Sequence, residues 1–392
     1  MIQSLTIYTL LLGIMMLCFY RAGCQTKALD YRVLDYYSTT STPSFWSFSV
    51  IFPMLLFAVV FGMRYDVGVD HLAYLDAYLS NRDASKNELL FRVITDFSHS
   101  LNLNFVIYFA ILAFIQVAFF FYAFKKEIYL FPLLIFFLFT NGDIIFWMNV
   151  IRQSIATCIW VCSLNFIVKK KFWRYVMFGV MAFLFHRSAI ALFVFYPILV
   201  GGRDYLKIIP LQLVLFASAF VVKEVFFDVI MNFSAVVDFY ISLLGAEMYE
   251  ASYNIDALVE NFKESTGTGL AYLWKVAINV IVIIYSGRLK KYYPSRWFNM
   301  IYFLYFVGLI TYYMFPVGAI SFSRPFRYLY IFQSIMLSYF VYYLYKNKTV
   351  NNAILAGLII LSFLGIFYLH HITSNRDSHL WYQFYFQSEI NA

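Results

Sequence analysis

Charged residues are scarce in this chain, since only 13% of its 392 residues are Asp, Glu, Lys or Arg. Hydrophobic residues make up 62% and aromatic residues 22%. A soluble protein of this size could not bury so much apolar surface, so the composition excludes an ordinary soluble enzyme. Alternating segments of about ten residues, which a membrane β-barrel requires, are also missing. Apolar runs long enough to cross a bilayer as helices recur instead.

Cysteine is also rare, with only four residues in the chain. Cys158 and Cys162 lie one helical turn apart in an apolar run, and we interpret them as packing residues. The chain has neither a metal-ligand spacing nor a disulfide framework. It also lacks long linkers and obvious repeats, so we predict a single integral membrane domain over residues 1–392.

The apolar runs predict an all-α, polytopic transmembrane protein with about 11–12 membrane helices, external loops and short interfacial helices. No positive charge precedes the first run, which favours an uncleaved helix over a signal peptide. Residues 172–200 form either one long helix or two short ones that break near His186. The predicted spans are 4–20, 45–63, 104–124, 128–146, 150–168, 174–200, 207–222, 225–243, 269–286, 297–315, 326–345 and 351–370.

The net charge of +8 comes from Lys and Arg that gather in short loops. This pattern is typical of cytoplasmic loops, and it accounts for the charge without a nucleic-acid partner. With loop 169–171 in the cytoplasm, alternation of the spans places loops 64–103 and 244–268 outside. The other basic loops then agree with a cytoplasmic position: 125–126, 288–291, Lys346 and Lys348.

The first external loop begins with a polar cluster directly after an apolar run. If residues 69–80 are helical, Asp70 and Tyr74 lie on one face at i, i+4 spacing. Glu88 follows at the start of a short amphipathic segment. The alternative interpretation is a snorkelling Arg beside a solvated loop, although an anchor does not require so many polar groups. The cluster consists of Arg64, Asp66, Asp70 and His71.

A second cluster, Arg152-Gln153, opens an apolar helix at its external end. A cation is unfavourable at a helix N-terminus unless an anion also binds there, because the free N–H groups of the first turn are already partly positive. The alternative is an Arg that is neutralised by the carboxylate of a neighbouring helix.

Two further clusters lie later in the chain. His186-Arg187 sits inside an apolar segment, where two ionisable groups cost several kcal/mol in lipid; the alternative is a packed core histidine. Arg324, Arg327 and Tyr328 share one face of a helix that starts near Pro325, or else anchor it at the membrane interface.

The basic clusters are all predicted on the external side. Arg binds phosphate through a planar fork of donors, so an external Arg-rich cavity suits a lipid-linked phosphate or diphosphate. A carboxylate or His beside that cavity could take a proton from an attacking hydroxyl.

In the order of these motifs, the chain resembles the EpsG family of polysaccharide-biosynthesis membrane proteins, which are functional relatives of the Wzy polymerases. The resemblance covers about residues 60–330, and His71 and Arg187 lie beside its pattern. The pattern is Arg64-Tyr65-x-x-Gly68-x-Asp70-x-x-x-Tyr74, then Glu88, Arg152-Gln153, His186-x-Ser188 and Arg324-x-x-Arg327-Tyr328.

The resemblance implies a bacterial inner-membrane enzyme that faces the periplasm. Such proteins join oligosaccharide repeat units carried on undecaprenyl diphosphate into O-antigen, capsule or exopolysaccharide. The growing chain leaves its lipid diphosphate and is transferred to a hydroxyl of the next unit. The resemblance implies no metal, nucleotide sugar or other cofactor. Its expected partners are the lipid-linked substrates, membrane lipid, a flippase and a chain-length regulator.

The residue roles follow from the same resemblance. We expect Asp70 to be the general base, with His186 and Glu88 as the other catalytic candidates. The expected ligands of diphosphate and sugar are Arg64, Tyr74, Arg152, Gln153, Arg187, Arg324, Arg327 and Tyr328. The functional alternatives are another membrane glycosyltransferase or ligase with a lipid-linked donor, a lipid-oligosaccharide flippase, and a non-catalytic assembly subunit.

The polymerase hypothesis predicts the phenotype of two arginine variants. Arg152→Ala and Arg324→Ala should each leave lipid-linked single repeat units and no long polymer, because the departing diphosphate loses a cation. Gel analysis of the cellular glycan measures this, and normal polymer in both variants would contradict the phosphate-clamp idea.

Overall fold

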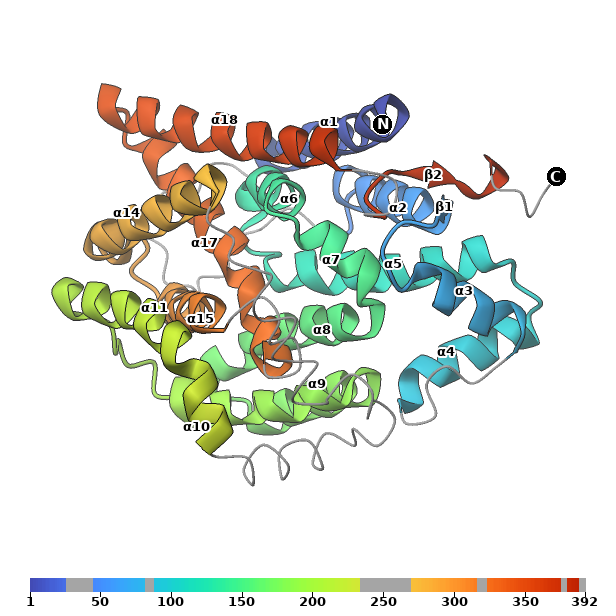
Figure 1. Cartoon of the computed structure of the whole chain (residues 1–392), viewed down its shortest axis with the longest axis horizontal. Coiled ribbons are helices and arrows are strands. Elements are labelled where there is room, and N and C mark those ends of the chain that lie inside the picture. Colours follow the sequence, from blue (N-terminus) through green and yellow to red (C-terminus); the bar gives the residue numbers. More distant parts are fainter. Residues whose placement is uncertain (26–44, 82–87, 233–268, 316–322, 375–378, 388–392) are drawn as a thin grey trace. The chain divides into compact units, whose positions relative to one another are not determined.

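A computed structural model of the chain describes residues 1–25, 45–81, 88–232, 269–315, 323–374 and 379–387, with no side-chain placement for 226–232. These residues are almost entirely helical, and two short strands form a single antiparallel pair among them (Figure 1). The all-α prediction is therefore confirmed. The predicted loop 244–268 lies outside the described residues.

The chain folds into two compact units, residues 1–201 with 337–392, and residues 202–336. The prediction of a single membrane domain stays a prediction. The first unit contains α1 (Ile2–Gln25), α2 (Phe48–Gly62), β1 (Arg64–Tyr65), α3 (His71–Leu79), α4 (Leu89–Ser100), α5 (Phe105–Ala123), η1 (Ile128–Leu130), α6 (Phe131–Thr140), α7 (Asp143–Asn149), α8 (Ile151–Val168), α9 (Phe172–Phe185), η2 (Arg187–Val194), α10 (Phe195–Leu199), α18 (Val350–Thr373), β2 (Gln383–Phe384) and η7 (Tyr385–Gln387).

The second unit contains α11 (Ile209–Asn232), α14 (Leu270–Tyr292), α15 (Arg296–Met314) and η5 (Arg324–Phe326). Helix α17 (Arg327–Lys346) begins in the second unit and ends in the first. The predicted break between spans 207–222 and 225–243 is wrong as far as the structure describes the chain, because α11 continues without interruption to Asn232.

Six helices of the described chain are long and apolar enough to cross a membrane: α1, α5, α8, α14, α15 and α18. The predicted straight span 128–146 is wrong, because η1 and α6 meet α7 at an angle of 64°. Gly142 lies in this break with φ of 94°, a conformation that glycine adopts without a steric penalty. Counting the bent pair as one span gives seven.

Residues 172–200 form two segments rather than one long helix. Helix α9 ends at Phe185, and His186 has an extended backbone with φ of −158°. The following segment folds back against α9, where Tyr175 Oη donates a hydrogen bond to the Leu192 carbonyl at 2.6 Å. The polar pair at positions 186–187 therefore lies at a chain reversal instead of in the middle of a membrane helix.

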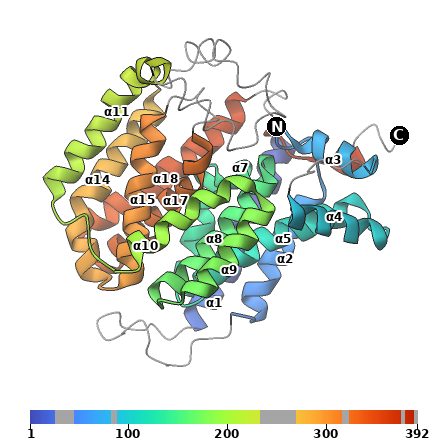
Figure 2. The same cartoon turned by 90° about the horizontal axis from the view of Figure 1, so that it is seen from below.

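Helices α2, α5, α8 and α9 lie side by side in that order in the first unit (Figure 2). Two polar contacts hold α5 to α8: Gln116 Nε2 donates to Ser154 Oγ at 2.7 Å in the interior, and the half-buried Asn165 Nδ2 donates to the Ala123 carbonyl at 3.0 Å. The second contact joins the C-terminal ends of both helices, so α5 and α8 run parallel. Cys158 is fully buried on α8, in agreement with a packing role.

The close approach of α2 to α5 yields a stability prediction. A Cβ atom on Gly62 would lie 2.4 Å from the Val106 carbonyl oxygen and 2.8 Å from Ala110 Cβ. Gly62→Ala should therefore lower the free energy of unfolding by about 1–3 kcal/mol and, with it, the melting temperature of the purified protein. Gly357→Ala is the matched control, since nothing lies within 4 Å of its added Cβ; equal melting temperatures for the two variants would contradict this packing.

Candidate functional site

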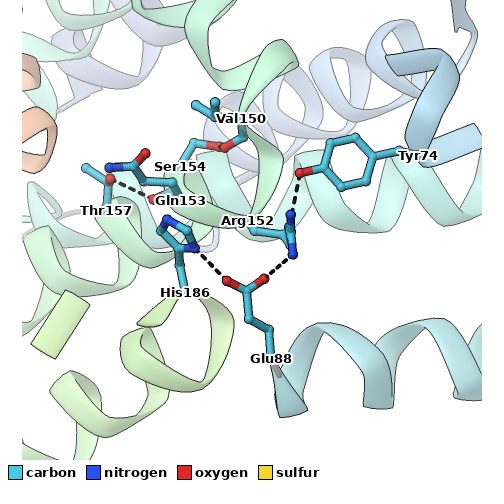
Figure 3. Close-up of polar contacts among 8 residues, drawn as sticks. All are labelled: Tyr74, Glu88, Val150, Arg152, Gln153, Ser154, Thr157 and His186. Carbon is cyan, nitrogen blue, oxygen red and sulfur yellow. Dashed lines mark hydrogen bonds and ion pairs between the residues drawn. The ribbon is translucent and has the colours of Figure 1, made fainter. Parts of the chain in front are cut away.

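The Glu88 carboxylate joins two cationic or ionisable side chains from distant parts of the chain. Glu88 is the N-cap residue of α4 and its side chain is only 7% exposed. Its Oε2 accepts a hydrogen bond from Arg152 Nη1 at 2.6 Å, and its Oε1 accepts one from His186 Nδ1 at 2.6 Å (Figure 3). One carboxylate thus links α4, the first turn of α8 and the chain reversal after α9.

Arg152 is also held by aromatic residues. Its Nε donates to Tyr74 Oη at 3.1 Å, and its guanidinium carbon lies 5.6 Å from the centroid of the Tyr74 ring and 5.9 Å from that of Phe91. Arg152 is therefore paired with a carboxylate from another helix, as one of the two sequence interpretations anticipated. That carboxylate compensates for a cation at a helix N-terminus.

The protonation states of the cluster follow from its contacts. Burial alone would raise the pKa of Glu88, but the hydrogen bond from His186 and the charge of Arg152 outweigh burial and hold that pKa below its usual value. Glu88 is then ionised at neutral pH and can only accept hydrogen bonds, so the Nδ1 atom of His186 carries a proton. In the neutral imidazole, Nε2 is then the proton acceptor. Burial raises the pKa of Tyr74, which keeps its phenol protonated.

The neighbouring residues of α8 fix the position of Arg152. Gln153 is buried and lies beside His186 in the close-up view (Figure 3). Thr157 Oγ1 donates to the Gln153 carbonyl at 2.8 Å, and Ser154 Oγ donates to the Val150 carbonyl at 2.9 Å. These bonds within one helix make its first turn a rigid support.

Arg64 is enclosed by backbone carbonyl groups. It is 2% exposed and donates to the carbonyls of Phe61 at 2.9 Å, Met148 at 3.2 Å and Val67 at 3.3 Å. Burial lowers the pKa of Arg64 to about 10, so it is still charged at neutral pH. Its contacts join the end of α2 to the end of α7.

The other polar residues of the first loop surround this junction. Residues 71–79 of the segment considered as a helix, 69–80, form α3, with Asp70 exposed at its N-cap. The backbone N–H of Asp70 donates to Asn149 Oδ1 at 2.9 Å. His71 is fully buried, and its Nδ1 accepts from the Asp66 N–H at 3.2 Å. Burial and the charge of Arg64 lower the pKa of His71 to about 2, so the imidazole is neutral.

The remaining predicted ligands belong to η2 and to the second unit. Arg187 is exposed at the start of η2, directly after His186. In the second unit, Arg324 begins η5 with Pro325 in its first turn, as predicted, and Arg327 Nε donates to Ser323 Oγ at 3.3 Å. Tyr328 is fully buried. The first two residues of this motif, 321–322, lie outside the described residues.

Two residues that hold the loop before α3 were not predicted from the sequence. Asn149, which holds the loop before α3, had no assigned role although it stands within the Arg152 motif. His379, whose Nδ1 pairs with Asp66 Oδ1 at 2.9 Å, is more than 300 positions away from its partner in the sequence. Within the described part of the chain, no group of three or more His, Cys, Asp or Glu side chains is arranged to hold a metal ion.

The lowered pKa of Glu88 makes its contribution to stability pH-dependent. A carboxyl with a lowered pKa in the folded state contributes stability above its ordinary pKa of 4.5, and loses it as the pH falls through the folded-state value. Glu88→Gln should therefore melt below wild type at neutral pH, with the difference shrinking in acid below about pH 4.5. Asp96→Asn, on the exposed face of the same helix, is the control. A difference that stays constant with pH would contradict the proposed charge state.

Comparison with known proteins gives a match to the EpsG family over residues 47–386, nearly the whole chain. No curated protein and no solved structure matches the sequence of this chain. The match and the six membrane-length helices are consistent with each other. This chain is therefore a multi-pass membrane protein that belongs to the EpsG family, a family of polysaccharide biosynthesis.

Proposed function

We propose that this protein is a polysaccharide polymerase of the bacterial inner membrane. It joins oligosaccharide repeat units carried on undecaprenyl diphosphate into O-antigen, capsule or exopolysaccharide. The observation that carries the proposal is the buried Glu88 carboxylate that holds Arg152 and His186 together. Transfer of a glycan from a lipid diphosphate to a hydroxyl needs a cation for the leaving group and a proton acceptor, and this cluster contains one of each.

The charge distribution along α8 supports a site on the periplasmic face. This helix has 18 residues, so it is about 27 Å long, with Arg152 in its first turn and Lys169 directly after its last residue. Several cations gather at the C-terminal end of α8. Burial and the positive charges of Lys126, Lys125, Lys171 and Arg174 therefore lower the pKa of Lys169. Clustered cations favour the cytoplasmic side. The Glu88 cluster at the opposite end of α8 then faces the periplasm.

In the proposed reaction, His186 is the general base. Its Nε2 accepts the proton of an acceptor sugar hydroxyl as the hydroxyl oxygen attacks the anomeric carbon of the donor glycan. The bond from that carbon to the lipid diphosphate breaks, and its electron pair leaves with the diphosphate. Glu88 stabilises the resulting imidazolium through the 2.6 Å hydrogen bond to Nδ1. This assignment replaces Asp70 as the favoured base, because Asp70 is exposed and lies at the start of α3.

Arg152 is the proposed cation for the leaving diphosphate. Its charge is fixed beside the base by Glu88 and Tyr74, so it need not reorganise during the reaction. Arg187, Arg324 and Arg327 are proposed as further phosphate ligands, with Gln153 and Tyr328 positioning sugar or phosphate.

We assign Arg64 a supporting role, because its donors bind the carbonyls that join α2 to α7. A flippase that supplies the lipid-linked units and a regulator of chain length are the proposed protein partners.

Removing the base or its partner tests the mechanism. Purified His186→Ala or Glu88→Gln protein, given lipid-linked repeat units, should form polymer about 10²- to 10⁴-fold more slowly than wild type, because general base catalysis is lost. The donor should still bind, so the loss should appear in kcat rather than KM. His370→Ala is the matched control, since His370 is exposed on α18.

Wild-type rates in the His186→Ala variant would overturn this assignment. A wild-type protein that forms no polymer but moves lipid-linked units across liposomes would favour transport.

A further inference from the structure

The C-terminal residues of the described chain contact the loop that leads into α3. We call residues 379–387 the C-terminal clasp. Strand β2 of the clasp pairs with β1, with Phe384 opposite Arg64 and Gln383 opposite Tyr65 (Figure 1). The two strands are separated by more than 300 residues in the sequence, so this pairing joins the two ends of the chain.

Hydrogen bonds extend the strand pairing on both sides. The Tyr385 N–H donates to the Met63 carbonyl at 3.0 Å, and the Gly68 N–H donates to the His379 carbonyl at 2.9 Å. His379 Nδ1 pairs with Asp66 Oδ1 at 2.9 Å. Loop 63–68 is therefore held by the clasp along its whole length.

The pair Asp66–His379 joins two residues with left-handed backbone conformations, one in the loop and one in the clasp. Asp66 has φ of 52° and His379 has φ of 51°, so both partners of the pair lie in the left-handed region. Side chains with a Cβ atom adopt this region at a steric cost, which the surrounding contacts must offset. The bonds to the clasp help to hold the loop in this shape.

The same loop is linked to the Glu88 cluster by two routes. By the first, Arg64 donates to the Met148 carbonyl and the Asp70 N–H donates to Asn149 Oδ1, at the end of α7 and just before Arg152. By the second, the loop continues into α3, which carries Tyr74 against Arg152. A displacement of the loop would therefore move the support of Arg152 from two directions.

We propose that the C-terminal clasp is a positioning element of the Glu88 site. In this proposal His379 acts through Asp66, which lies in loop 63–68, on the positions of Tyr74 and Arg152. The kinetic part of this proposal rests on the proposed function. The clasp is itself anchored to α1, because the Tyr382 N–H donates to Ser4 Oγ at 2.9 Å and Gln3 Nε2 donates to Gln387 Oε1 at 2.7 Å. It ties the first helix of the chain to the site.

A set of four variants tests the clasp. His379→Ala removes the donor to Asp66, and we expect kcat for polymerisation to fall about 10- to 100-fold, because the site loses its alignment. His379→Asn should restore most of the activity, since Asn carries a donor nitrogen at the position of Nδ1 and tolerates positive φ. Asp66→Asn combined with His379→Ala should be no worse than His379→Ala alone. His370→Ala, on the exposed face of α18 and outside the clasp, should behave as wild type.

Hydrogen exchange gives a second measurement that needs no substrate. In His379→Ala, amide exchange should accelerate in residues 71–79 and 148–153 and stay unchanged in the middle of α18. A loss of activity and thermal stability that His379→Asn does not rescue would show a merely structural role and overturn the proposal. Wild-type exchange and activity in His379→Ala would also overturn it. If the wild-type protein proves inactive as a polymerase, the proposed function fails, while the exchange measurement still decides the role of the clasp.

Discussion

The arrangement of the first unit depends on one buried carboxylate. Glu88 accepts hydrogen bonds from Arg152 and His186, and both distances are 2.6 Å. Removing one partner of a buried charged pair leaves an uncompensated charge, which is strongly destabilising. The position of α4, the first turn of α8 and the reversal after α9 are therefore set together by Glu88. The same interaction keeps Glu88 ionised at neutral pH, so the packing and the proposed chemistry have one origin.

Much of the local structure could be predicted from the sequence. Apolar runs indicated the membrane-length helices, and the helix considered for residues 69–80 corresponds to α3. Glu88 was expected at the start of a short amphipathic segment, and this segment is helix α4, which begins directly after Glu88. Arg152 was expected in the first turn of a helix, with a neighbouring carboxylate as one possible partner. These features follow from periodicity and helix-end chemistry, which act over a few residues.

The identity of the partners could not be predicted in this way. The sequence favoured Asp70 as the base, whereas Glu88 contacts His186 across 98 positions. Arg64 looked like a phosphate ligand, but its donors bind carbonyls that include that of Met148, 84 positions away. The bend near Gly142 and the continuity of α11 also depend on packing that an apolar run does not encode. A polar residue type indicates that a partner exists, and only the fold decides which one.

The length of α8 has a consequence for the membrane around the protein. Its 18 residues extend about 27 Å, slightly less than the ~30 Å of bilayer hydrocarbon. A bilayer whose headgroups meet Lys169 in one leaflet would place Arg152 at the hydrocarbon boundary of the other. Under the proposed function, the diphosphate of the lipid carrier would lie at that same depth and would meet Arg152 without leaving its leaflet. A thicker bilayer would draw Arg152 beneath the headgroups, which makes bilayer thickness a physical determinant of how the site meets its substrate.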